Sequence, residues 1–184
     1  DEWVVEGTLE VSAPHPVAAM VLTHTLTERG ETLVLASKGS SGWDGRGPLV
    51  IPSLKAGGGY HSELVLINPD ESDMEGVITV FGRDSRTVSE ASQPVPYYLA
   101  PGGVFRWRLE SSYGVSETSY GVIRPTVGVA PSAMARVKLL KGTLLLSQTE
   151  IPARVSTQNA WFPIDTLPSI ICHGESQMRF TFAN

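Results

Sequence analysis

The sequence predicts an all-β protein built from antiparallel β-sandwich lobes, and three observations support this prediction. No apolar stripe with the 3.6-residue period of a helix continues for more than about two turns. Runs that alternate between apolar and polar side chains recur roughly every ten residues, as expected for short strands. The 184 residues include 18 glycines and 13 prolines, a share above the usual ~12%, so turns are expected to be frequent.

The clearest alternating run places Phe105, Trp107 and Leu109 on one face of a strand and Arg106 and Arg108 on the other. The two arginines are expected to lie on a solvated sheet face or to pair with carboxylates on neighbouring strands. Similar patterns predict further strands at residues 3–11, 17–27, 31–36, 60–68, 76–83, 95–99, 118–124, 133–140, 143–149, 159–163 and 176–184.

Turn residues separate these runs. The segment Pro101–Gly103 suits a type II turn, because proline fixes φ and glycine accepts a positive φ. Asn68–Pro69 is expected to end a strand, and tight hairpins are predicted at Arg29–Gly30 and Lys141–Gly142. Four prolines are expected to interrupt strand-like runs: Pro14, Pro16, Pro125 and Pro131.

The composition narrows the function classes. Hydrophobic residues make up 41% of the chain, enough for a packed core, and charged residues make up 18%. The formal net charge of −5 argues against a nucleic-acid partner, which would need a basic face. Apolar runs such as Val17–Leu22 are far shorter than the ~20 residues of a spanning helix, so no membrane span is expected. The lone cysteine, Cys172, cannot form an intrachain disulfide.

The chain resembles itself at an offset of about 114 residues, which predicts an internal repeat. A repeat of this length holds roughly eight strands, the size of one β-sandwich. Five pairs of segments match in the same order along the chain. The matched segments begin at Gly7 and Gly121, at Pro16 and Pro131, at Gly30 and Gly142, at Leu49 and Ala160, and at Ser62 and Met178.

At this period the chain holds about 1.6 copies of the repeat. Residues 1–50 are expected to form an incomplete N-terminal sandwich half, and residues 51–165 a complete repeat. Residues 166–184 are expected to open a further repeat with a single strand. That strand would expose Met178, Phe180 and Phe182 unless another surface covers them.

The segments Gly57–Tyr60, Glu63–Pro69 and Gly76–Phe81 resemble a repeat found in large secreted and surface proteins of environmental bacteria. In that family three glycines and an aromatic residue precede a strand of alternating leucines closed by Asn-Pro, and Pro101–Phe105 is similar to the next element. The resemblance covers nearly the whole chain. It implies Ig-like sandwiches that serve as stalks, adhesin modules or fibre units outside the cell or at its surface, without catalytic residues.

No constellation of residues predicts an enzyme, a cofactor or a metal site. Cys172 and His173 are adjacent, and neighbours on a strand point to opposite faces, so they cannot easily share a metal. Gly57–Gly59 is interpreted as a flexible turn rather than a phosphate cradle, because a strand follows it. Four carboxylates crowd one loop, interpreted as a solvated hairpin with a calcium site as the alternative: Asp70, Glu71, Asp73 and Glu75.

Aromatic side chains near loops allow a second kind of ligand. Exposed rings can stack on sugars, which keeps a glycan partner open, whereas packing in the core or between domains is the default interpretation. The aromatic residues in or near loops are Trp43, Tyr97, Tyr98, Tyr113 and Tyr120.

The favoured hypothesis is a non-enzymatic extracellular structural protein that assembles head to tail by β-strand exchange. The C-terminal strand of one copy would insert beside the N-terminal half of the next, and its partners would be other copies of itself. The alternative is an adhesin or glycan-binding module of a larger secreted protein. The subunit interface is expected at Trp3, Val5, Leu9, Met178, Phe180 and Phe182.

Overall fold

The computed structural model describes residues 9, 11, 13–15, 19–38, 45, 47–82, 93–109 and 117–155. In this part of the chain there are eleven strands and no helix, so the predicted all-β fold is confirmed. The strands are β1 (Met20–Leu26), β2 (Thr32–Lys38), β3 (Leu49–Ala56), β4 (Tyr60–Ile67), β5 (Met74–Gly82), β6 (Val95–Leu99), β7 (Val104–Leu109), β8 (Glu117–Val127), β9 (Ser132–Lys141), β10 (Leu144–Pro152) and β11 (Arg154–Val155).

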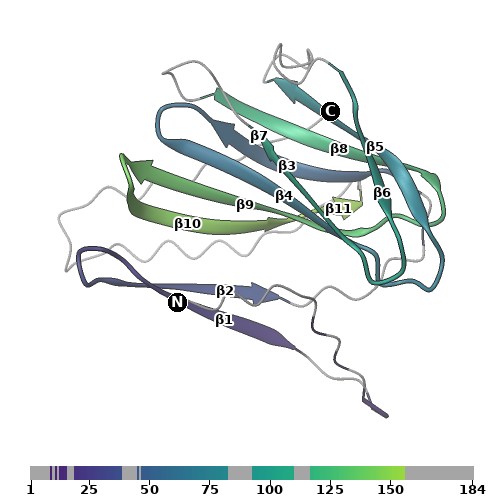
Figure 1. The fold of residues 1–184 in the computed structure, drawn as a ribbon, viewed down its shortest axis with the longest axis horizontal. Helices are drawn as coiled ribbons and strands as arrows, with labels where there is room; N and C mark the ends of the chain where they lie inside the picture. The colour runs from purple at the N-terminus through teal and green to yellow at the C-terminus, as the bar shows by residue number, and fades with distance from the viewer. Residues whose placement is uncertain are drawn as a thin grey trace, which may run out of the picture.

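Strands β3 to β11 form two antiparallel sheets that pack face to face as a sandwich (Figure 1). One sheet has the order β10-β9-β4-β7, and the other has the order β11-β3-β8-β5-β6. Both sheets send apolar side chains into the space between them, as a two-layer fold requires. The buried core includes Ile51, Leu54, Leu64, Leu66, Ile78, Leu99, Ile123 and Ala135.

Strands β1 and β2 form a separate sheet of two antiparallel strands, and β2 lies beside β10 (Figure 1). Their turn contains Gly30 at a φ of 76°, and the N–H of Gly30 donates to the carbonyl of Thr27 at 2.9 Å. The turn between β9 and β10 likewise contains a glycine of positive φ, Gly142 at 64°. Both hairpins predicted from the sequence are therefore confirmed.

Three consecutive glycines let the chain cross from one sheet to the other between β3 and β4. Gly57, Gly58 and Gly59 have φ values of 78°, 59° and 87°, a region that residues with a side chain rarely adopt. The N–H of Tyr60 donates to Gly57 at 3.0 Å, and the N–H of Leu140 donates to Gly59 at 2.7 Å. The segment is thus a hydrogen-bonded turn that leads into β4, so the predicted turn before a strand is confirmed.

Prolines lie inside three strands, and the expectation that Pro125 interrupts its strand is wrong. Pro125 lies beside a register shift with β5 and beyond the residues of β8 that pair with β3. Pro52 falls within the register shift of β3 between Ile51 and Leu54, and Pro96 belongs to the edge strand β6. These are the places where a missing N–H removes the fewest ladder hydrogen bonds.

The predicted strand end at Asn68–Pro69 is confirmed, since β4 ends at the preceding residue. Asn68 is fully buried. Its Nδ2 donates to the carbonyls of Ser72 at 2.8 Å and Leu99 at 3.0 Å, and its Oδ1 accepts from the N–H of Asp70 at 2.9 Å. The side chain therefore holds together the end of β4, the loop before β5 and the end of β6.

The predicted turn at Pro101–Gly103 and the strand after it are also confirmed. Gly102 has a φ of 69°, and the N–H of Gly103 donates to the carbonyl of Ala100 at 2.8 Å, as a type II turn requires. Strand β3 had no counterpart among the predicted strands, because Pro52 and Lys55 break its apolar alternation.

Candidate interaction surface

The two faces of the hairpin β1–β2 differ in exposure. On one face Leu35 and Ser37 of β2 are half-buried, although Val21 of β1 on the same face is exposed. The opposite face is open to solvent on both strands. Single exposed apolar side chains are ordinary on a protein surface, but several on one face of two strands form a patch. We call this patch the hairpin face; its apolar members are Met20 (65% exposed), Leu22, Leu26 (73% exposed) and Val34.

Strand β1 has a hydrogen-bonded neighbour on one side. It pairs with β2 from Met20↔Lys38 to Leu26↔Thr32, and no other described strand pairs with it. Its second edge presents backbone N–H and C=O groups, which are a template for an added strand. The seven residues of β1 contain no proline that would block such pairing.

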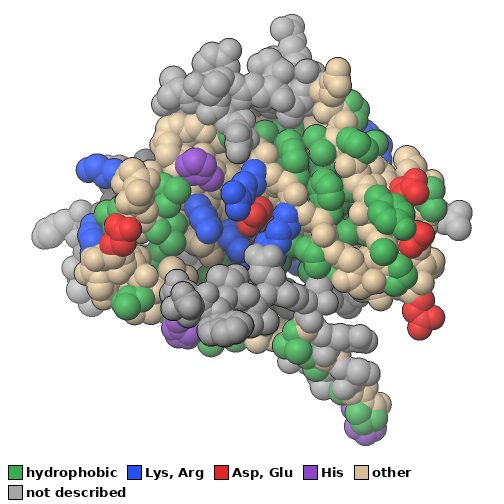
Figure 2. All heavy atoms as spheres, viewed as in Figure 1, with side chains coloured by type: hydrophobic (Ala, Val, Ile, Leu, Met, Phe, Trp, Pro, Cys, Tyr) green, Lys and Arg blue, Asp and Glu red, His purple; other side chains and the backbone are tan. Residues whose placement is uncertain are grey.

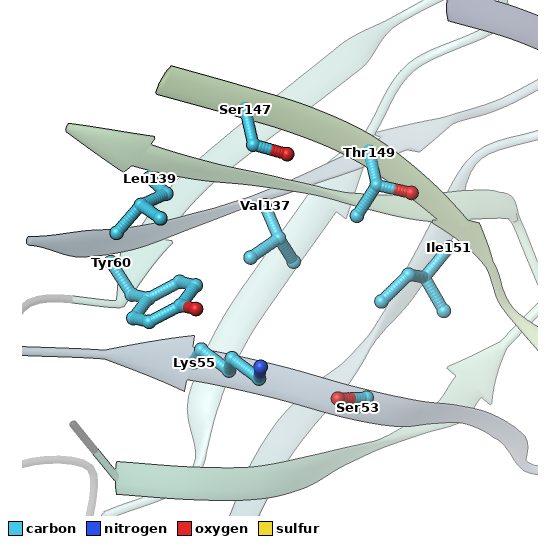
Figure 3. Close-up of a pocket in the computed structure, with 8 residues that line it drawn as sticks. All are labelled: Ser53, Lys55, Tyr60, Val137, Leu139, Ser147, Thr149 and Ile151. Atoms are coloured by element: carbon cyan, nitrogen blue, oxygen red, sulfur yellow. The ribbon is translucent and has the colours of Figure 1, made fainter. Parts of the chain in front are cut away.

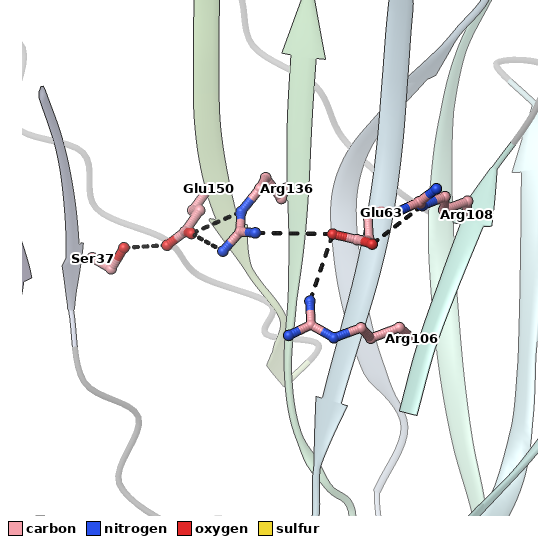
Figure 4. A network of polar contacts seen from close by, with 6 residues as sticks. All are labelled: Ser37, Glu63, Arg106, Arg108, Arg136 and Glu150. Atoms are coloured by element: carbon pink, nitrogen blue, oxygen red, sulfur yellow. Dashed lines mark hydrogen bonds and ion pairs between the residues drawn. The ribbon is translucent and has the colours of Figure 1, made fainter. Parts of the chain in front are cut away.

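The hairpin is joined to the sandwich through Ser37 on β2 and Glu150 on β10 (Figure 4). The hydroxyl of Ser37 donates to Oε2 of Glu150, and Arg136 donates to Oε1 from Nη2 at 3.0 Å and from Nε at 3.3 Å. The side chain of Glu150 is 8% exposed, and a buried carboxylate is costly unless such partners satisfy it. Both of its oxygens have partners here.

Glu63 is the second carboxylate of the same row (Figure 4). Its Oε1 lies 3.3 Å from Nε of Arg108, and its Oε2 lies 3.7 Å from Nη1 of Arg106 and 3.9 Å from Nη1 of Arg136. In the strand registers, Arg108 lies opposite Glu63, Glu63 opposite Arg136, and Arg136 opposite Glu150. A row of ion pairs therefore crosses the four-stranded sheet, which confirms that Arg106 and Arg108 pair with carboxylates.

On the face shown in Figure 2, basic side chains gather around a carboxylate. The row contains three arginines and two glutamates, so it is locally positive although the chain has a formal net charge of −5. Its outer end is well solvated, with Arg108 75% exposed, and exposed ion pairs contribute little to stability. The end at Arg136 and Glu150, beside the hairpin, is the buried one.

A cleft of about 270 Å³ opens between β3 and the hairpin β9–β10 (Figure 3). The ammonium of Lys55 lies 4.6 Å from the ring centroid of Tyr60, a cation–π contact. One ring face of Tyr60 is therefore occupied by Lys55. Residues of β3 form one wall of the cleft, and Val137, Leu139 and Ile151 on the inner face of β9–β10 form the other wall. Strand β3 therefore runs across the inner face of β9–β10.

The carboxylates of the acidic loop are exposed. Oδ1 of Asp70 accepts from the N–H of Glu71 at 2.7 Å, and Asp73 accepts a hydrogen bond from the hydroxyl of Tyr98. Within the described residues, no group of three or more His, Cys, Asp or Glu side chains is arranged to hold a metal ion. The calcium alternative therefore gains no support from this loop.

Two of the aromatic residues considered for glycan stacking belong to the core. The ring of Tyr120 is buried and stacks on Phe81 with centroids 5.2 Å apart. Tyr97 is buried against Phe105, and burial raises the pKa of Tyr97 to about 12. Among the described residues, its hydroxyl has no hydrogen-bond partner. Both rings therefore pack in the core and do not present a face for a sugar.

Among the described members of this set, Tyr98 is the exposed one. It lies opposite Glu75 in the register of β5 and β6. The hydrogen bond to Asp73, and then the charges of Asp73 and Glu75, raise the pKa of the Tyr98 hydroxyl. Trp43 and Tyr113 lie outside the described residues.

Of the predicted interface residues, Leu9 lies in the described part of the chain and is 82% exposed. The other five lie outside it: Trp3, Val5, Met178, Phe180 and Phe182. Sequence reasoning missed the hairpin face as a candidate site, although Met20, Leu22 and Leu26 lie at even spacing within the strand predicted at 17–27.

No family model matches the chain, and no curated protein matches it. The crystal structure of Thermotoga maritima 1070 resembles it with a TM-score of 0.45 and 14% sequence identity, over 62% of this chain and 97% of that chain. This similarity carries no functional assignment. Among the described residues, no helix is long and apolar enough to cross a membrane.

Proposed function

We propose that the protein is a non-enzymatic subunit of an extracellular filament that assembles head to tail by β-strand exchange. Residues 176–184 of one copy would add to the open edge of β1 in the next copy. The observation that carries this proposal is the coincidence, on one strand, of an edge that pairs with no described strand and an exposed apolar face.

The donor segment has the pattern that such a strand needs. Met178, Phe180 and Phe182 alternate with Arg179 and Thr181, so the three large apolar side chains share one face of an extended strand. Added to β1, they would extend its exposed apolar face, and each contributes ~1.5–3 kcal/mol once that face is covered. Donor and acceptor are different surfaces of the chain, so the contact is heterologous, and repetition gives an open filament.

A deletion of residues 176–184 tests the proposal. We expect the full chain to form fibres that negative-stain electron microscopy detects, and the truncated chain to stay monomeric in light scattering after size-exclusion chromatography. A full chain that stays monomeric at every concentration, or a truncated chain that still forms fibres, would overturn the proposal.

A matched pair of substituted chains keeps the length of the donor constant. Ser at positions 178, 180 and 182 removes the apolar face, whereas Ala at positions 179 and 181 changes only the opposite face. We expect the first set of substitutions to abolish fibres and the second set to retain them. Equal behaviour of the two variants would contradict a donor that docks through its apolar face.

A glycan-binding module is the second candidate, favoured by Tyr98. Its ring is exposed and lies next to two carboxylates, Asp73 and Glu75. An aromatic face for stacking and carboxylates that accept hydroxyl hydrogen bonds are the groups that recognise a sugar. Strand β6 holds Tyr98 in place, and Asp73 fixes its hydroxyl.

A glycan array with the wild-type protein and a Tyr98→Ala variant tests this candidate. Sugars that bind the wild-type protein but not the Tyr98→Ala variant would support this candidate. Glu71→Ala is the control, because Glu71 lies outside the cluster around Tyr98. Binding that survives in Tyr98→Ala, or no binding at all, would eliminate this site.

A further inference from the structure

A single strand added to the edge of β1 leaves the hairpin face uncovered, because strand pairing extends a sheet sideways and does not cover it. The sandwich itself shows how this chain covers a comparable hairpin. Strand β3 runs across the inner face of β9–β10 (Figure 3), and Ile51 and Leu54 on β3 are fully buried. Strand β4 pairs with the edge of β9.

The hairpins β1–β2 and β9–β10 correspond in sequence and in shape. The segments from Pro16 and Gly30 match those from Pro131 and Gly142. Both hairpins are antiparallel, and both turn at a glycine of positive φ. The two partners of β9–β10 also have sequence counterparts: residues 49–52 of β3 match 160–163, and residues 62–68 around the end of β4 match 178–184.

From these correspondences we infer that the hairpin face and the edge of β1 together form a docking site for residues 160–184 of a second copy. The segment supplies two strands: residues 178–184 pair with the edge of β1, as β4 pairs with β9. Residues 160–163 lie across the hairpin face, as β3 lies across β9–β10. The source of the segment in a second copy rests on the proposed function.

The pairing of β4 with β9 also gives the register. Ser62 lies opposite Val137, and Leu64 lies opposite Ala135. When this register is transferred through the sequence match, Met178 lies opposite Leu22, and Phe180 lies opposite Met20. These four side chains then share the face that is exposed in β1. The added strand widens the hairpin face, and the segment at 160–163 is what covers it.

Disulfide trapping tests the register. In a Cys172→Ser background, one chain carries Leu22→Cys and a second, separately tagged chain carries Met178→Cys. We expect mixing under mild oxidation to give a covalent heterodimer. In the control, the second chain carries Phe180→Cys instead of Met178→Cys, so the thiol lies on the same face of the strand but two positions further along. We expect the yield of heterodimer to drop on the order of tenfold, since disulfide geometry is strict.

The outcomes separate the inference from the proposed function. Fibres without the Leu22–Met178 crosslink would overturn the register and leave strand exchange standing. A crosslink that forms only within one chain carrying both cysteines would support the docking site and overturn exchange between copies. A crosslink of equal yield at both positions would overturn the register as well.

Oxidation of Met20 tests the covering strand. A strand at the edge alone leaves the thioether of Met20 exposed, whereas a strand across the hairpin face buries it. We expect peroxide oxidation of Met20, measured by mass spectrometry, to slow on the order of tenfold in the assembled protein. Phe162 matches the buried Ile51, so Phe162→Ser should restore the oxidation of Met20 in the assembled protein. Trp161 matches the half-buried Val50, so Trp161→Ser should not restore it. Unchanged oxidation on assembly would overturn the two-strand site.

Discussion

The hydroxyl of Ser37 donates to the carboxylate of Glu150, and this hydrogen bond joins the hairpin to the edge of the sandwich. Glu150 uses Oε2 for Ser37 and Oε1 for Arg136. Attachment of the hairpin and the ion pairs of the sheet therefore share one carboxylate, so a change at either end is expected to affect the other.

Ser37→Ala should loosen the hairpin while the sandwich stays folded. The variant loses a hydrogen bond to a charged acceptor, worth ~1.5–3 kcal/mol. Hydrogen exchange should become faster at the amides of β1 and β2 and remain unchanged in β4 and β8. Ser147→Ala, on the same strand as Glu150 but exposed, is the control. Equal acceleration throughout the chain would show that the hairpin and the sandwich unfold together.

Arg136 and Arg108 should differ in their contribution to stability. Arg136 contacts both Glu63 and Glu150, and its loss leaves the mostly buried Glu150 without its cation. Arg108→Ala removes a largely exposed guanidinium from Glu63, which keeps Arg106 and Arg136, and should cost below ~0.5 kcal/mol. Arg136→Ala should cost roughly 2–3 kcal/mol. Urea unfolding measures both. Similar costs would mean that burial does not set the strength of the row.

Asn68→Ala should lower the free energy of unfolding by about 3 kcal/mol, because two carbonyls and one N–H lose their partner in a buried place. Asn68→Asp should be worse at neutral pH, since it directs a carboxylate at the carbonyls of Ser72 and Leu99. Thermal unfolding would rank the two variants. An Asp variant as stable as wild type would show that the Nδ2 contacts are not needed.

Tyr97→Phe should stabilise the fold by about 1 kcal/mol, because it removes a buried hydroxyl that has no hydrogen-bond partner in the described part of the chain. The variant should also change the pH profile. The pKa of Tyr97 is raised to about 12 in the folded state from 10.0, so between these values the unfolded chain loses its proton first and stability falls as the pH rises. That part of the fall should be smaller in Tyr97→Phe. Identical alkaline profiles would contradict the raised pKa.

The fold was predictable where one strand face is polar and the other apolar. Strand β7 was predicted from Phe105 and Trp107 against two arginines, and the turns from their glycines. Strand β3 was missed because Pro52 interrupts its pattern. The proline is tolerated there because it lies in a register shift, which is defined by the pairing of β3 with β8.

The surface was predictable in part. Pairing of Arg106 and Arg108 with a carboxylate followed from their place on one strand face, but the identity of Glu63 depended on the register of two strands. The contact of Ser37 with Glu150 joins residues 113 positions apart. No local pattern encodes it, because it follows from where the hairpin lies relative to β10.

The placement of prolines makes the sheet edges unequal. Pro96 lies on the edge strand β6, Pro152 ends the edge strand β10, β11 has two residues, and β7 carries two arginines on its outer-facing side. Each feature disfavours pairing of that edge with a strand of another molecule. Strand β1 has neither a proline nor an arginine. Strand β2, the other edge of the hairpin, likewise has neither of them. Among the described strands, the edges without such features therefore belong to the hairpin, so growth by strand addition would start at the hairpin and not at the sandwich.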